Sequence, residues 1–120
     1  MKIIYGGRGS GKTTRLIEES AKDGGYIVCI TKRACSRVFS QAQKLELDIP
    51  FPITYDELIK GQFYGKGIKG FHIDNVEYLL KHICRRVPLK TITFTPFGSL
   101  EKLEIPKDIM DAYKLQLAGE

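Results

Sequence analysis

The chain has 120 residues, of which 42% are hydrophobic and 28% are charged. It is long and apolar enough for a folded domain and too apolar for a disordered chain. The formal net charge of +5 suits a polyanionic ligand, either a nucleotide or a nucleic acid. Three cysteines without a C-x-x-C pair argue against a disulfide framework and a structural zinc site. No apolar run approaches the roughly 18 residues of a membrane helix, and the start MKIIYGG is too short for a signal peptide, so we expect a cytoplasmic protein.

Short apolar runs alternate with helix-like segments along the chain. Residues 26–30 form a continuous apolar run, which is typical of a strand buried on both faces. The pattern predicts strands over residues 2–5, 26–30, 53–54, 71–73, 90–95 and 100–105, and helices over residues 13–22, 33–47, 55–60, 76–86 and from Pro106 onward. This order predicts an α/β fold with three layers, in which helices cover both faces of a mainly parallel sheet of about five strands. We expect one domain over residues 1–120, with an antiparallel hairpin of the last two strands.

A glycine-rich segment follows the first predicted strand and opens the first predicted helix. Residues 6–13, GGRGSGKT, match the phosphate-binding pattern G-x-x-x-x-G-K-[ST]. Glycines let the backbone curve around a phosphate chain with its N–H groups facing the anion, and the start of the helix adds a positive dipole end. The candidate nucleotide-binding residues are Gly6, Gly7, Arg8, Gly9, Ser10, Gly11, Lys12, Thr13 and Thr14. Lys12 is placed to bridge the outer phosphates, and the Thr13 hydroxyl is placed to bind Mg²⁺.

A candidate acid, Asp74, ends the predicted strand at residues 71–73. A phosphate-binding loop needs a carboxylate at the end of a neighbouring strand to hold the water shell of Mg²⁺. The sequence therefore indicates Thr13 and Asp74 as the metal-binding residues. The alternative is that Asp74 caps the helix that follows, since aspartate is a favoured N-cap residue.

The two motifs resemble those of the P-loop NTPases of the additional-strand class, which includes helicases, recombinases and phage terminase motors. Residues 6–13 are similar to the Walker A motif and residues 71–74 to the Walker B motif, and GGRGSGKT looks most like the loop of phage ATPases. The resemblance covers residues 2–96. It implies ATP and Mg²⁺ as ligands and Lys12 as a catalytic residue. It also implies that residues 91–95 are a sensor strand, with Thr95 at its polar end.

One position departs from this family. Members that hydrolyse ATP well carry a glutamate directly after the Walker B aspartate, as the base for the attacking water, whereas this chain has Asn75. Glu77 would come within about one turn of the site on a helix that starts at residue 75. Glu77 is therefore the candidate base, with a solvated acid at the helix start as the alternative. The departure affects the expected turnover and not the expected binding.

Basic residues follow the second motif. Arg85 and Arg86 are candidates for an arginine finger acting on a neighbouring subunit, or for contacts with DNA phosphates. The alternative is a solvated helix end whose cations favour the helix dipole. Further candidates for a DNA surface are Lys32, Arg33, Arg37, Lys66 and Lys69, with Tyr55, Phe63 and Tyr64 as aromatic residues able to stack on bases.

The leading hypothesis is a Mg-ATP-binding protein with slow or partner-stimulated ATPase activity, acting in phage or mobile-element DNA metabolism. Its expected partners are a nucleoside triphosphate and DNA or a DNA-processing protein, and oligomers are compatible with it. One alternative is a small nucleotide or nucleoside kinase, for which the basic loop at residues 61–70 would be the lid. The other is a non-catalytic, nucleotide-gated adaptor, which Asn75 favours.

Overall fold

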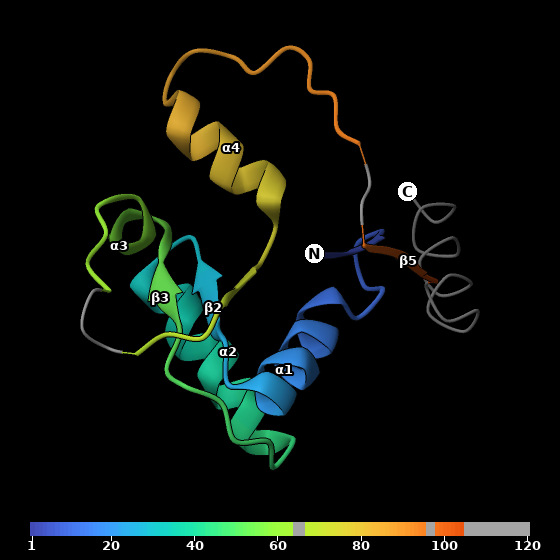
Figure 1. The fold of residues 1–120 in the computed structure, drawn as a ribbon, viewed down its shortest axis with the longest axis vertical. Helices are drawn as coiled ribbons and strands as arrows, with labels where there is room; N and C mark the ends of the chain where they lie inside the picture. Colours follow the sequence, from blue (N-terminus) through green and yellow to red (C-terminus); the bar gives the residue numbers. More distant parts are fainter. Residues whose placement is uncertain (64–66, 96–97, 105–120) are drawn as a thin grey trace, which may run out of the picture. The chain divides into compact units, whose positions relative to one another are not determined.

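The computed structural model describes residues 1–63, 67–95 and 98–104. Its elements follow the order β1 (Lys2–Gly6), α1 (Lys12–Asp23), β2 (Tyr26–Cys29), α2 (Lys32–Lys44), β3 (Ile53–Thr54), α3 (Tyr55–Ile59), β4 (Phe71–Ile73), α4 (Val76–Cys84) and β5 (Ser99–Leu103) (Figure 1). The fold is α/β, and the strand pairings in these ranges are parallel, as predicted. The chain divides into two compact units, one made of residues 1–12 and 93–120 and the other of residues 13–92.

The larger unit is built on a three-stranded sheet in the order β3-β2-β4. In its central strand, Ile27 and Val28 are completely buried. Alternate residues of a strand point to opposite faces of the sheet. Ile27 and Cys29 accordingly pack in one cluster with residues of α1 and α2, whereas Val28 packs in another with Tyr55 of α3 and Leu79 of α4. The prediction of a central strand buried on both faces by helices is confirmed for this sheet.

Short capping motifs start two helices directly after strands of this sheet. The Thr31 hydroxyl, two residues beyond β2, accepts a hydrogen bond from the Ala34 N–H at 3.1 Å and caps α2. Thr54 and Glu57 form a capping box at α3, with each side chain bonded to the backbone N–H of the other residue at 3.1 Å. Each cap satisfies amides that a helix start otherwise leaves unpaired. The carboxyl ends of β2 and β3 therefore lead at once into helices.

The smaller unit contains a second sheet, in which β1 and β5 run parallel with Lys2 opposite Ser99 and Gly6 opposite Leu103. The prediction of an antiparallel hairpin between residues 90–95 and the last strand is wrong, because residues 90–95 have no regular secondary structure. Alternating β-prone residues indicate which side chains share a face, but they do not identify the partner strand. The strands of the described ranges form two sheets, one of two strands and one of three.

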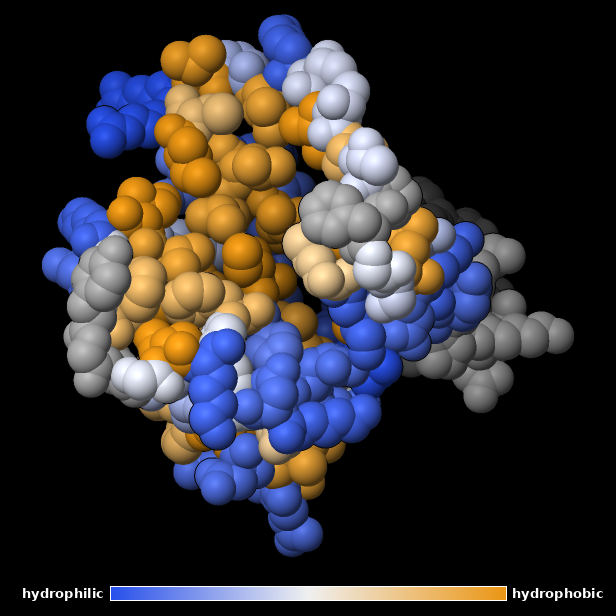
Figure 2. Space-filling view, viewed as in Figure 1, coloured by the Kyte–Doolittle hydropathy of each residue, from blue (hydrophilic) through white to orange (hydrophobic). Residues whose placement is uncertain are grey.

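Apolar side chains are also exposed on the larger unit. Figure 2 shows them gathered over α3, β3 and α4, where the exposed large apolar residues include Ile59, Val76 and Ile83. No helix within the described ranges is long and apolar enough to cross a lipid bilayer. The expected C-terminal helix from Pro106, together with Tyr64 and Lys66, lies outside the described residues.

Candidate functional site

The glycine-rich loop over residues 7–11 joins β1 to α1. Gly9 and Gly11 have φ angles of +79° and +88°, in the left-handed region that residues with a side chain rarely adopt. A Cβ atom added to either glycine would meet no other atom within 4 Å. Backbone conformation, and not lack of space, therefore requires glycine at these two positions, and the loop curves as the sequence pattern predicts.

Gly6 is required for a different reason, which is close packing beneath the loop. A Cβ atom at this position would lie 2.5 Å from the Ser10 Oγ and 2.7 Å from the carbonyl oxygen of Leu103. The Ser10 hydroxyl is buried and has no hydrogen-bond partner in the described part of the chain. A buried hydroxyl without a partner is costly.

Lys12 folds back over the loop. Its Nζ donates hydrogen bonds to the carbonyl oxygens of Gly6 and Gly7, both at 2.9 Å. The helix that Lys12 opens has no acidic residue in its first turn, so its own side chains do not neutralise the positive end of the helix dipole. The loop side chain of Arg8 is exposed. The loop and the start of α1 therefore combine positive charge with curved, glycine-rich backbone.

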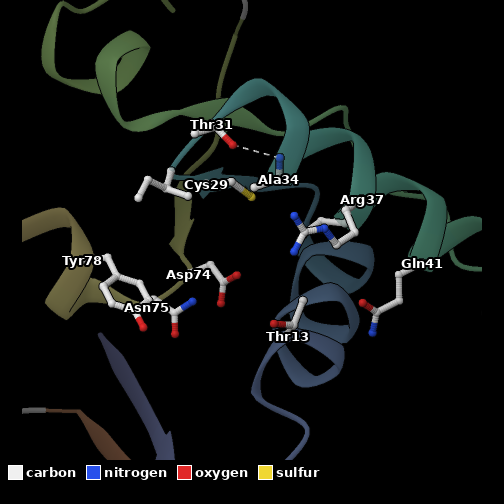
Figure 3. Close-up of a pocket in the computed structure, with 11 residues that line it drawn as sticks. Thr13, Cys29, Thr31, Ala34, Arg37, Gln41, Asp74, Asn75 and Tyr78 are labelled. Atoms are coloured by element: carbon white, nitrogen blue, oxygen red, sulfur yellow. Dashed lines mark hydrogen bonds between the residues drawn. The ribbon is translucent and has the colours of Figure 1, made fainter. Parts of the chain in front are cut away.

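The larger unit contains a cavity of about 380 Å³ (Figure 3). It lies at the start of α1, the end of β2, the facing side of α2 and the turn from β4 into α4, and its lining residues are Thr13, Cys29, Ile30, Thr31, Ala34, Arg37, Val38, Gln41, Asp74, Asn75 and Tyr78. The two residues predicted to bind metal, Thr13 and Asp74, therefore line one cavity although they are far apart in the sequence. In Figure 3 the Thr13 hydroxyl and the Asp74 carboxylate point toward one another across it.

This pair of oxygen ligands fits Mg²⁺ better than a transition metal. Mg²⁺ prefers hydroxyl, carboxylate and phosphate oxygens, and it keeps several waters while one or two protein ligands bind it. In residues 1–63, 67–95 and 98–104, no group of three or more His, Cys, Asp or Glu side chains could hold a metal ion. Thr13 and Asp74 are thus the residues that could hold a magnesium ion brought by a phosphate ligand.

A buried tyrosine fixes the turn that carries Asp74. The Tyr55 hydroxyl donates toward the backbone carbonyl oxygens of Asp74 at 2.6 Å and Asn75 at 3.0 Å. Tyr55 is only 1% exposed, so the prediction that it stacks on nucleic-acid bases is wrong. Burial raises the pKa of the Tyr55 phenol, and the negative charge of Asp74 raises it further. The hydroxyl therefore remains a neutral donor at physiological pH.

The residue after Asp74 adopts an unusual backbone conformation. Asn75 has φ 57° and ψ 70°, in the left-handed region, and it occupies the N-cap position of α4 without a capping hydrogen bond from its side chain. The helix cap is therefore Asn75, and the alternative role of Asp74 as the N-cap residue is wrong. Asparagine is one of the few residues with a side chain that tolerate this conformation.

The α2 wall contributes residues for which the sequence suggested another role or none. The Gln41 Nε2 donates to the Thr14 hydroxyl oxygen at 2.9 Å, which ties α2 to the first turn of α1. Arg37, one turn before Gln41, also lines the cavity, whereas the sequence assigned it only to a DNA surface. The position of Arg37 in the chain could have indicated this role. Ligands of parallel α/β proteins bind at the carboxyl ends of strands, and α2 follows the end of β2. Thr14 is thus engaged between two helices.

The other candidates are not among the lining residues of this cavity. Glu77, in the first turn of α4, is exposed and is not among the lining residues, where Tyr78 stands instead. Arg85 ends α4 with a φ of 61°, and Arg85 and Arg86 are both exposed. Thr95 is exposed in the segment without regular structure, in the smaller unit. The structure therefore brings Thr13 and Asp74 together and does not add Glu77, Arg85 or Arg86 to them.

The comparisons with known proteins give no family for this chain. No protein-family model matches it, and neither a curated protein nor a solved structure matches it.

Proposed function

We propose that this protein binds Mg-ATP, with the phosphates on residues 6–12 and the magnesium ion on Thr13 and Asp74. One observation carries the proposal. Thr13, the last residue of GGRGSGKT, lines the same cavity as Asp74, the acid that the sequence indicates from its place at a strand end. Two motifs that are unrelated in sequence position therefore supply the two oxygen ligands that a magnesium–phosphate complex requires.

The loop supports the same proposal. Left-handed glycines at positions 9 and 11 curve the backbone, and the positive end of α1 carries no neutralising acid in its first turn. An anion that binds this loop would meet backbone N–H groups, a helix dipole and the Lys12 ammonium. Lys12 would then exchange its two carbonyl partners for phosphate oxygens.

The proposal extends to a coarse mechanism. Bound Mg²⁺ would neutralise negative charge on the phosphates and make the terminal phosphorus more electrophilic. The chain's own residues would hold the phosphates: the loop amides bind them, and Lys12 balances their charge. Because Asn75 occupies the position of the family's base and Glu77 is exposed outside the cavity, we expect slow or partner-stimulated hydrolysis, in phage or mobile-element DNA metabolism.

A second candidate, the non-catalytic adaptor, has one observation in its favour. Asp74 is the one carboxylate among the cavity's described lining residues, so this wall offers no separate base for the attacking water. A single-turnover assay with excess protein separates the two functions. An ATPase converts bound ATP to ADP, whereas an adaptor releases ATP unchanged.

The proposal also includes a detailed fold and a location in the cell. A three-layer P-loop domain with about five strands in one sheet fits a chain in which β1 leads through the loop into α1. Helices on both faces of β2 also support it. We place the protein in the cytoplasm of a bacterial or phage-infected cell, where ATP and Mg²⁺ are plentiful.

The proposal is tested by calorimetric titration of the wild type with ATP, in the presence of Mg²⁺ or EDTA. We expect binding that Mg²⁺ strengthens. Asp74→Asn should lose most of that strengthening and keep the Mg²⁺-free affinity, because the amide keeps the shape and loses the charge. Asp48→Asn, the same change at an exposed residue outside the cavity, is the matched control. A wild type that binds no ATP would refute the nucleotide site, and equal affinities with and without Mg²⁺ would refute the metal role.

A further inference from the structure

The α2 wall of the cavity is held against the start of α1. Gln41 bonds to Thr14 at 2.9 Å, and Thr14 directly follows the proposed metal ligand Thr13. Residues four apart on a helix lie on the same face, so Arg37 stands one turn from Gln41 on the face that lines the cavity. The Gln41–Thr14 bond therefore fixes the helix face that carries Arg37 relative to Thr13.

Arg37 directs its charge into the cavity. Figure 3 shows its guanidinium pointing into the space between Asp74 and Thr13. Its side chain has no hydrogen-bond or ion-pair partner among the described residues. Among the described lining residues, it is also the one cation. The guanidinium carries five N–H donors, which an anion in this cavity could use.

The helix itself gives Arg37 no alternative role. The residues three and four positions away are Arg33, Ala34, Ser40 and Gln41, so no carboxylate is placed for an ion pair along α2. Arg37 also lies in the middle of Lys32–Lys44, too far from the last turn to stabilise the helix dipole. Arg37 is exposed to solvent and also lines the cavity, so a ligand that enters from solvent can reach its guanidinium.

We infer that Arg37 is a phosphate-binding residue, whose guanidinium contacts an oxygen of the terminal phosphate of the bound triphosphate. The inference rests on the proposed function, because a magnesium ion held by Thr13 and Asp74 would bring the outer phosphates to this cavity. The terminal phosphate then lies in the cavity into which Arg37 projects. The planar fork of a guanidinium matches phosphate oxygens in a bidentate pair. The contact exists with a triphosphate and is absent with a diphosphate, so Arg37 lets the site distinguish ATP from ADP.

The experiment compares the affinities for Mg-ATP and Mg-ADP by calorimetry. We expect Arg37→Ala to weaken ATP binding about 10- to 100-fold, as for one charged hydrogen-bonded contact, and to leave ADP affinity unchanged. Arg37→Lys, which keeps the charge and loses the fork, should lie between the wild type and Arg37→Ala. Lys44→Ala removes one positive charge from an exposed position on the same helix and should change neither affinity. Thermal unfolding of each variant controls for loss of the fold.

Each of the remaining outcomes would overturn either the inference about Arg37 or the proposed function. An unchanged ratio of ATP to ADP affinity in Arg37→Ala, with the wild type binding both, refutes the inference and leaves the proposed function intact. A wild type that binds neither nucleotide refutes both. A third arm titrates AMP into protein loaded with Mg-ADP. If Arg37→Ala weakens AMP binding but keeps the ATP-to-ADP ratio, the guanidinium serves a second phosphate-bearing substrate, and the terminal-phosphate role is wrong.

Discussion

The loop at residues 7–11 and the cavity of the larger unit are shaped by different parts of the chain. In the loop, neighbouring residues fix the geometry: Gly9 and Gly11 supply left-handed backbone, and Lys12 bonds to the carbonyls of Gly6 and Gly7. In the cavity, side chains from distant segments do so. Tyr55 holds the turn after β4, and Gln41 holds the start of α1.

The difference shows which functional residues a local pattern can reveal. A loop defined by its own backbone leaves a compact motif in the sequence. A wall assembled from several elements leaves single residues, such as Arg37 or Tyr55, that look ordinary until the chain is folded. Substitutions in the loop should therefore weaken ligand binding as a whole. Substitutions in the cavity wall should instead reduce the preference for Mg²⁺ or for a triphosphate.

The largest expected effect is in the loop. Lys12→Ala should weaken ATP binding by about 100-fold or more, because two charged contacts with phosphates are lost. The fold should survive, since the Lys12 ammonium lies over the loop, bonded to the carbonyls of Gly6 and Gly7. Calorimetry measures the affinity, and Lys22→Ala, at the exposed far end of α1, is the control. Normal ATP binding by Lys12→Ala would show that this loop does not bind phosphates.

A smaller and more selective effect is expected in the cavity wall. Tyr55→Phe removes the donor that bridges the Asp74 and Asn75 carbonyls. The free energy of unfolding should fall by about 1–2 kcal/mol. The gain in ATP affinity from Mg²⁺ should shrink, because the turn that carries Asp74 loses its anchor, whereas the Mg²⁺-free affinity should stay the same. Tyr26→Phe, a half-buried tyrosine of the same unit, is the matched control.

The pH dependence sharpens this test. Burial raises the pKa of folded Tyr55 above its ordinary value. The folded protein therefore keeps a proton that the unfolded chain releases above about pH 10. The wild type should lose stability as the pH rises through that value, and Tyr55→Phe should lose less. Identical alkaline unfolding curves would mean that the hydroxyl contributes nothing to the turn.

The smallest expected effect concerns the surface outside both regions. If Arg85 and Arg86 contact DNA phosphates, replacing both with alanine should lower the salt slope of DNA affinity by about 1 to 2. Electrophoretic or fluorescence titrations over a range of salt concentrations measure the slope. A double variant that keeps DNA affinity and loses ATPase activity would point to an arginine finger. If the wild type binds no DNA at low salt, the net charge of +5 serves solubility and the attraction of nucleotides instead.

Much of the fold could be predicted from the sequence where the signal was local. The apolar run at residues 26–30 predicted β2. The short run at residues 71–73, followed by an acid, predicted β4 and the position of Asp74. The pairing of β5 with β1 could not be predicted, because parallel partners far apart in the sequence share no turn that fixes their register. Tyr55 was misjudged for a related reason: a single tyrosine in the sequence does not reveal whether its side chain is buried.

Asn75 limits how this site could change in evolution. Its left-handed backbone, φ 57° and ψ 70°, lies at the position where the resembling family carries its glutamate base. Glutamate tolerates that conformation less well than asparagine does, at a cost of about 1 kcal/mol. A single substitution would therefore add the carboxylate and strain the same turn that Tyr55 anchors. If the protein hydrolyses ATP as proposed, a glutamate base gained at this position would come with a loss of stability in the turn.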